Sequence, residues 1–161
     1  MSSAATTVKN GLIAFDFDQT IIDANSDTAV IDLVHGPVPD EAQKLYADDN
    51  WTDYMQAIFR LLHAQGAQKK RFDDLLASLP FVEGLPDLLQ WLVSNDFEVI
   101  IISDSNSYFI DHVLLTHDLD GLVTRVFTNP ARFDENGVLL IEWYHVQDYC
   151  NLSNKNLCKG K

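Results

Sequence analysis

Basic residues are scarce in this chain. Lys and Arg together number 11 against 24 Asp and Glu, so the formal net charge is −13 at pH 7. A surface this negative repels nucleic-acid backbones and anionic membranes, and we expect neither as a partner. An anionic phosphorylated substrate would also need a metal ion or local cations to be held against this charge.

Long apolar runs and cysteines are equally rare. No run approaches the roughly 18 apolar residues of a membrane-spanning helix, and the opening MSSAATTVKNG lacks the apolar core of a secretion signal. The two cysteines, Cys150 and Cys158, provide no disulfide framework. We therefore expect a cytoplasmic protein of one domain, with room for a small insertion.

The stretch GLIAFDFDQTIID, residues 11–23, organises the rest of the chain. Its apolar run, residues 12–15, predicts a buried parallel strand that delivers Asp16 and Asp18 at its carboxyl end. Residues two apart share a face of a strand, so both carboxyl groups could converge on one crevice. Such a pair suits a Mg²⁺ site or a nucleophile beside a proton carrier, while a solvated acidic turn is the alternative.

A second apolar run, FEVIII at residues 97–102, predicts a central strand. It ends in Ser103-Asp104-Ser105-Asn106-Ser107, ahead of a helix predicted over 108–116. Hydroxyl and backbone N–H groups at the start of a helix can bind phosphate. An ordinary helix cap explains the same residues, and the sequence leaves both readings open.

The region between the two strands, residues 27–81, is helical in pattern and carries no strong strand signal. Ser26 is expected to cap its first helix, with Asp27 in the first turn, where an acid serves the helix dipole or faces a substrate. The cluster Lys69-Lys70-Arg71 reads as a solvated turn. An inserted helical segment at this place would cover the crevice.

The later part of the chain predicts a further strand over 123–128. A turn signal follows at 134–137, and an extended segment at 138–144, which together predict a β-hairpin added to the sheet. The tail holds His145, Cys150 and Cys158, which could be soft metal ligands, but their spacing matches no zinc signature and we expect no metal there.

Three strings, DFDQTIIDANSD, SDSNSYFI and NKNLCKGK, carry a family resemblance. The first resembles the DxDxT motif of the haloacid dehalogenase (HAD) superfamily. Together they resemble the phosphoethanolamine/phosphocholine phosphatases, a branch with pyridoxal-phosphate phosphatase-like members, over residues 12–161. The resemblance implies an α/β fold with a Rossmann-like core and a parallel sheet. The core would comprise residues 11–26 and 82–161, and a small helical cap 27–81.

The resemblance also implies roles for individual residues. Asp16 would attack phosphorus and form an aspartyl-phosphate, while Asp18 would be the acid/base. Asp16 and the main-chain carbonyl of Asp18 would hold Mg²⁺, and Thr20 would fix the loop. Lys159 would neutralise the phosphoryl group, with the fallback lysines being Lys155 and Lys161.

Substrate recognition follows from the same comparison. Ser103 would bind the phosphoryl group, and Asp27 and Asp104 would face a cationic or polar leaving group, with Asn106 in the same substrate-binding set. The family usually shows SDAN where this chain has SDSN. The implied activity is Mg²⁺-dependent hydrolysis of a small phosphomonoester, with phosphoethanolamine, phosphocholine and pyridoxal 5′-phosphate all open.

The superfamily's fourth motif, a GDxxxD-like acidic pair, has no match after Lys159. We therefore expect the C-terminal part of the core to be missing, with weakened metal binding and turnover. One alternative is a truncated, inactive protein that binds phosphate or a partner, and another is a phosphotransferase that passes phosphate to an alcohol. The oligomeric state stays open.

Overall fold

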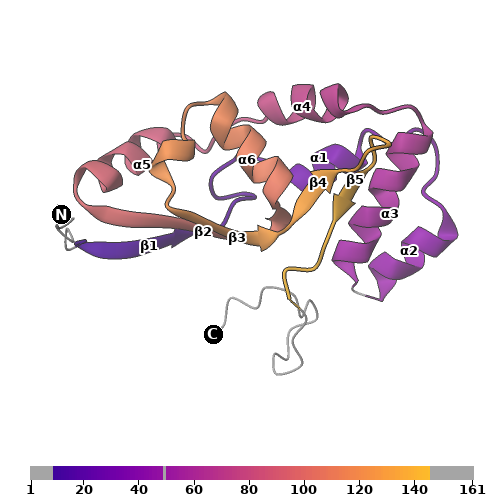
Figure 1. The fold of residues 1–161 in the computed structure, drawn as a ribbon, viewed down its shortest axis with the longest axis horizontal. Helices are drawn as coiled ribbons and strands as arrows, with labels where there is room; N and C mark the ends of the chain where they lie inside the picture. Colours follow the sequence, from indigo (N-terminus) through magenta and orange to yellow (C-terminus); the bar gives the residue numbers. More distant parts are fainter. Residues whose placement is uncertain (1–8, 49, 146–161) are drawn as a thin grey trace.

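The computed structural model describes residues 9–48 and 50–145. Its three-stranded sheet is parallel and has the order β1 (Gly11–Phe15), β2 (Phe97–Asn106), β3 (Arg125–Asn129). Phe15 pairs with Ile101, and Ile102 with Phe127, so the carboxyl ends of the three strands meet at one edge (Figure 1). The predicted α/β fold with a parallel sheet is confirmed.

Helices α5 (Leu85–Ser94) and α6 (Ser107–Thr116) lie on one face of this sheet (Figure 1). Leu89 of α5 and Phe109 of α6 are fully buried, because apolar side chains there leave water for the core. The run in β1 is less buried than its composition predicts: Leu12 is 57% exposed. Among the described residues β1 is an edge strand, which explains this difference.

Of the five helices described between β1 and β2, four precede α5. They are α1 (Ser26–Ile31), α2 (Asp40–Ala47), α3 (Trp51–Ala64) and α4 (Lys69–Ala77). The two ends of this helical segment lie side by side. The Asp23 N–H donates to Pro80 O (2.8 Å), and the Val82 N–H donates to Ile21 O (3.1 Å). The predicted helical character of this segment is confirmed, and no helix of the described residues is long and apolar enough to cross a membrane.

Two local expectations in this segment are wrong. Asn25, not Ser26, caps α1, since its side chain accepts the Thr28 N–H at 2.8 Å. Ser26 is instead fully buried as the first helical residue. The cluster 69–71 is not a turn but the first turn of α4, where Lys69 and Lys70 each pair with an aspartate four residues on.

The predicted hairpin exists, but it does not join the main sheet. Strands β4 (Ala131–Phe133) and β5 (Leu139–Ile141) form a separate antiparallel pair. Gln56 of α3 donates to Leu139 O (3.1 Å) and accepts the Ile141 N–H (2.9 Å), so the edge of β5 is satisfied by a helix rather than by a strand. A short 3₁₀ helix, η1 (Asp120–Leu122), precedes β3.

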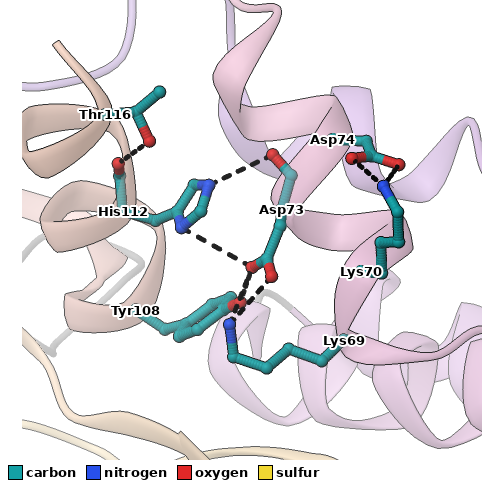
Figure 2. A network of polar contacts seen from close by, with 7 residues as sticks. All are labelled: Lys69, Lys70, Asp73, Asp74, Tyr108, His112 and Thr116. Carbon is teal, nitrogen blue, oxygen red and sulfur yellow. Dashed lines mark hydrogen bonds and ion pairs between the residues drawn. The ribbon is translucent and has the colours of Figure 1, made fainter.

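A polar network joins α4 to α6 (Figure 2). The Asp73 carboxylate accepts hydrogen bonds from Lys69 Nζ (2.8 Å) and from the Tyr108 hydroxyl. His112 places Nε2 3.1 Å from the Asp73 backbone oxygen and Nδ1 3.5 Å from its carboxylate. Burial acts to raise the pKa of Asp73, but the hydrogen bonds from Lys69 and Tyr108 outweigh it and lower that pKa. This carboxylate is thus well compensated.

Candidate active site

The two motif aspartates lie where the sequence predicts, directly after β1. Phe17 between them is fully buried, and its carbonyl accepts the N–H groups of Ile21 (2.8 Å) and Ile22 (3.2 Å) in a tight turn. The Asp16 carboxylate accepts the Phe17 N–H at 2.7 Å. Because Phe17 is anchored in the core, the residues on either side of it, Asp16 and Asp18, are held at the carboxyl end of the sheet.

A chain of hydrogen bonds connects this turn to the end of β2. The Ser26 N–H donates to Asp18 Oδ1 at 2.8 Å, and the Ser26 hydroxyl lies 3.0 Å from that of Ser105. The Ser105 N–H donates to Ser103 Oγ at 3.2 Å. The structure therefore brings the two sequence motifs together. Ser26 and Ser105 provide the link, a role that sequence reasoning did not assign.

The end of β2 departs from regular pairing. The register between β2 and β3 shifts between Ile102 and Asn106, as a bulge does, which re-aims the side chains in between. Asn129 holds the bulge: its Nδ2 donates to Asp104 O (2.9 Å) and Ser105 O (3.1 Å). This role of Asn129 was not predicted from the sequence. Its position at the end of a predicted strand is the one signal that could have indicated it.

Ser103 and Asn106 are almost inaccessible. Ser103 is 1% exposed and Asn106 is 0% exposed. The Asn106 side chain caps α6 by accepting the Phe109 N–H at 3.1 Å, so the helix-cap reading applies to this residue. Its buried Nδ2 has no hydrogen-bond partner among the described residues. A direct role of Asn106 in substrate binding remains a prediction.

Asp27 is the electrostatically unusual group of the site. It is 4% exposed, and its Oδ2 accepts the Trp51 indole N–H at 2.6 Å. Burial raises the pKa of its carboxyl to about 7; the charges of Asp18 and Asp104 raise it further, and the Trp51 hydrogen bond acts against them. At neutral pH this carboxyl is poised between its charged and neutral forms.

The residues present fit a Mg²⁺ ion as a partial ligand set. Within residues 9–48 and 50–145 no three His, Cys, Asp or Glu side chains gather as a closed metal site would require. Mg²⁺ does not need such a site, because it keeps several waters and binds through one or two carboxylates. Burial and the charges of Asp18 and Asp104 raise the pKa of Asp27, and negative charge gathered in this way is the kind of environment that a cation relieves.

The predicted residues of the tail lie outside the described residues. They are Lys155, Lys159, Lys161, Cys150 and Cys158. Of this region only His145 is described. It is exposed, and its ring packs edge-on against Tyr144 with the centroids 5.2 Å apart.

Comparison with solved structures defines the class of fold. A HAD family hydrolase from Salmonella enterica serovar Typhi superposes with a TM-score of 0.58 at 22% identity, over 82% of this chain and 44% of that one. The parallel sheet, with its motif aspartates after β1, is thus the Rossmann-like core of the HAD fold.

The chain belongs to the family described as Putative Phosphatase, which matches residues 11–161. It is 42% identical over 151 residues to the human pyridoxal phosphate phosphatase PHOSPHO2, covering 92% of this chain and 62% of that protein. It is 32% identical over 161 residues to the human phosphoethanolamine/phosphocholine phosphatase, covering 98% of this chain and 60% of that one. The chain therefore spans less than two thirds of the length of these relatives.

Proposed function

We propose that this chain is a phosphoric monoester hydrolase that acts on a small phosphorylated metabolite with Asp16 as its nucleophile. The observation that carries the proposal is the hydrogen-bonded path from Asp18 through Ser26 and Ser105 to Ser103. This path holds the candidate acid/base, which lies two residues after the candidate nucleophile, and a candidate phosphate-binding hydroxyl at the same end of adjacent parallel strands. The names of the relatives support the reaction class.

In this proposal Asp16 attacks phosphorus, the bond to the leaving oxygen breaks, and Asp18 donates a proton to that oxygen. Water, deprotonated by Asp18, then attacks the aspartyl-phosphate, releasing phosphate and regenerating the Asp16 carboxylate. Asp16 and the backbone carbonyl of Asp18 would hold Mg²⁺, which supplies positive charge for the phosphoryl oxygens. Lys159 would add a further positive charge.

The cap assignment is part of the same proposal. Residues 27–81 would form the cap, and residues 11–26 with 82–161 the core. The backbone hydrogen bonds at Asp23–Pro80 and Ile21–Val82 support this division, because the helical segment begins and ends close to them. A helical cover over the carboxyl ends of the strands would exclude water from the aspartyl-phosphate until its hydrolysis.

For the substrate, we propose a small phosphomonoester with a cationic or nitrogen-bearing leaving group, such as phosphoethanolamine, phosphocholine or pyridoxal 5′-phosphate. The buried Asp27 beside Asp104 supports this choice, since two carboxyl groups favour a cation over a neutral or anionic group. Cytoplasmic location and Mg²⁺ dependence belong to the same proposal.

The test is release of inorganic phosphate from phosphoethanolamine, phosphocholine, pyridoxal 5′-phosphate and pyrophosphate, with and without Mg²⁺. We expect Mg²⁺-dependent release that falls by at least about 10³-fold in Asp16→Asn, because the amide cannot act as the nucleophile. Undiminished release in Asp16→Asn would refute the nucleophile. A folded chain that binds phosphate without releasing any would overturn the hydrolase in favour of a binding protein.

Product analysis with an added alcohol acceptor separates hydrolysis from phosphotransfer. We expect inorganic phosphate as the sole phosphorylated product. A phosphorylated alcohol that depends on Asp16 would replace the hydrolase with a transferase that uses the same aspartate.

A further inference from the structure

Trp51 belongs to neither sequence motif, yet it makes a short polar contact at the candidate site. It is the first residue of α3, and its indole N–H donates to Asp27 Oδ2 at 2.6 Å across 24 positions of the chain. The other carboxylate oxygen, Asp27 Oδ1, is buried without a hydrogen-bond partner among the described residues. A nearly inaccessible carboxylate with one satisfied oxygen is costly unless a ligand completes it.

The hydrogen bond is the favourable contact of an otherwise unfavourable environment. Burial and the charges of Asp18 and Asp104 all oppose the anionic form of Asp27, and the bond from Trp51 supports it. Indole N–H is a donor only, so it holds Oδ2, while Oδ1 stays buried without a hydrogen-bond partner among the described residues. Trp51 is thus in a position to fix both the direction of the carboxylate and its preference for a positive ligand.

The indole is itself held from two sides. Its ring packs against Tyr46 and Tyr54, with centroid distances of 5.9 and 5.5 Å. The helix that carries it is fastened to the β4–β5 hairpin through both ends of the Gln56 amide. A donor on a rigid, packed support loses little on binding a ligand, so the Asp27 geometry is set in advance.

We propose that Trp51 is a positioning residue for substrate selection: by holding Asp27 Oδ2, it directs Oδ1 toward the cationic leaving group of the substrate. This inference rests on the proposed function. It adds that α3, through Trp51, helps to determine which phosphomonoester is preferred. The aromatic face of the indole also suits a substituted ammonium group.

The decisive variant is Trp51→Phe, which keeps an aromatic ring and removes the N–H donor. For phosphoethanolamine we expect KM to rise about 10-fold with kcat changed less than about 3-fold, because a binding contact to a charged group is lost. For glycerol phosphate, which lacks the amine, we expect kcat/KM to change less than about 3-fold. Equal losses for both substrates would overturn the positioning role.

Trp143→Phe is the matched control. Trp143 Nε1 donates to Asp53 Oδ1 at 3.2 Å, so this indole pairs with an exposed carboxylate instead of with Asp27. The same substitution there removes the same kind of hydrogen bond, and we expect both substrates to behave as in the wild type. An equal shift in KM for phosphoethanolamine would show that the effect of Trp51→Phe is not specific to Asp27.

A readout that needs no turnover separates this inference from the proposed function. The chain has 3 tryptophans, and the indole N–H resonance missing in Trp51→Phe identifies Trp51. We expect that resonance to shift in Asp27→Asn, and to shift on addition of ethanolamine in the wild type but not in Asp27→Asn. A resonance indifferent to both changes would overturn the inference, whether or not phosphate is released. If both shifts occur but no inorganic phosphate is released, only the proposed hydrolase activity is refuted.

Discussion

Two buried or half-buried aspartates of the helical segment have opposite environments. Asp73 of α4 receives hydrogen bonds from Lys69 and Tyr108, and its pKa is lowered despite partial burial. Asp27 of α1 receives one hydrogen bond from Trp51, is more completely buried, and has its pKa raised to about 7. Ionised Asp73 is therefore satisfied within the fold, whereas ionised Asp27 is not.

The difference separates a structural carboxylate from a functional one. A carboxylate compensated by a lysine and a hydroxyl contributes to folding and has little left to offer a ligand. A carboxylate buried beside other negative charges reduces stability, and such groups concentrate at sites where a ligand completes them. Substituting each aspartate in turn tests this difference.

The largest expected effect is on catalysis. We expect Asp27→Asn to lower kcat/KM for phosphoethanolamine by about 10- to 100-fold, because the neutral amide no longer attracts the ammonium group. We expect Asp73→Asn to stay within about 3-fold of the wild type. Steady-state kinetics on both variants test this prediction. A greater loss of kcat/KM in Asp73→Asn than in Asp27→Asn would contradict it.

The next effect is on stability at neutral pH. We expect Asp73→Ala to lower the free energy of unfolding by about 1 to 2 kcal/mol, since Lys69 and Tyr108 lose their acceptor at a partly exposed site. Because the pKa of folded Asp73 is lowered, its stabilisation is present above its unfolded pKa and is lost as the pH falls through the folded one. Urea unfolding measures both effects, and a wild-type midpoint in Asp73→Ala would contradict them.

Asp27 should show the opposite dependence on pH. Its unfolded carboxyl titrates near 3.8 and its folded one near 7, so between these values the folded state keeps a proton that the unfolded state releases. The stability it contributes therefore falls as the pH rises through this interval. In Mg²⁺-free buffer we expect Asp27→Asn to be more stable than the wild type by about 1 to 3 kcal/mol at pH 8, with the difference shrinking toward pH 5. A difference independent of pH would refute this account.

Removing one donor from the compensated network has a smaller consequence. We expect Tyr108→Phe to cost about 1 kcal/mol, because the Asp73 carboxylate loses one hydrogen bond but keeps Lys69. Tyr46→Phe, at a side chain 61% exposed, is the control and should leave the unfolding midpoint unchanged. Equal unfolding midpoints for the two variants would show that the Tyr108 hydroxyl does not contribute to stability.

The smallest effect separates two neighbouring ion pairs on α4. The Lys70–Asp74 pair is exposed on both sides, at 80% and 64% of the side chains, whereas Asp73 is 26% exposed. We expect Lys70→Ala to change the free energy of unfolding by less than about 0.5 kcal/mol and Lys69→Ala to change it by more. Reversal of that order in urea unfolding would show that the network does not depend on burial.

Much of the fold was predictable because its signals are local. The apolar runs that precede Asp16 and Ser103 predict strands by composition, and the structure has strands there. Met55, Ile58, Phe59 and Leu62 recur at helical spacing and form a buried face of α3. The wrong expectations for the α1 cap and for the hairpin concern contacts that these local patterns do not specify. Asn25, one residue earlier than predicted, accepts the Thr28 N–H, and the backbone of β5 bonds Gln56, 83 residues before Leu139, instead of a strand of the main sheet.

The sequence by itself determined the chemistry available here: two aspartates after a strand, a serine cluster after the next, and a helical insertion between them. Residue type and short spacing are sufficient for that, because strand periodicity fixes which neighbours share a face. Only the tertiary structure decided that Asp27 is buried near other negative charges and that Trp51 is its hydrogen-bond donor. Burial and pKa depend on every chain segment packed around a group, and those segments are distant in sequence.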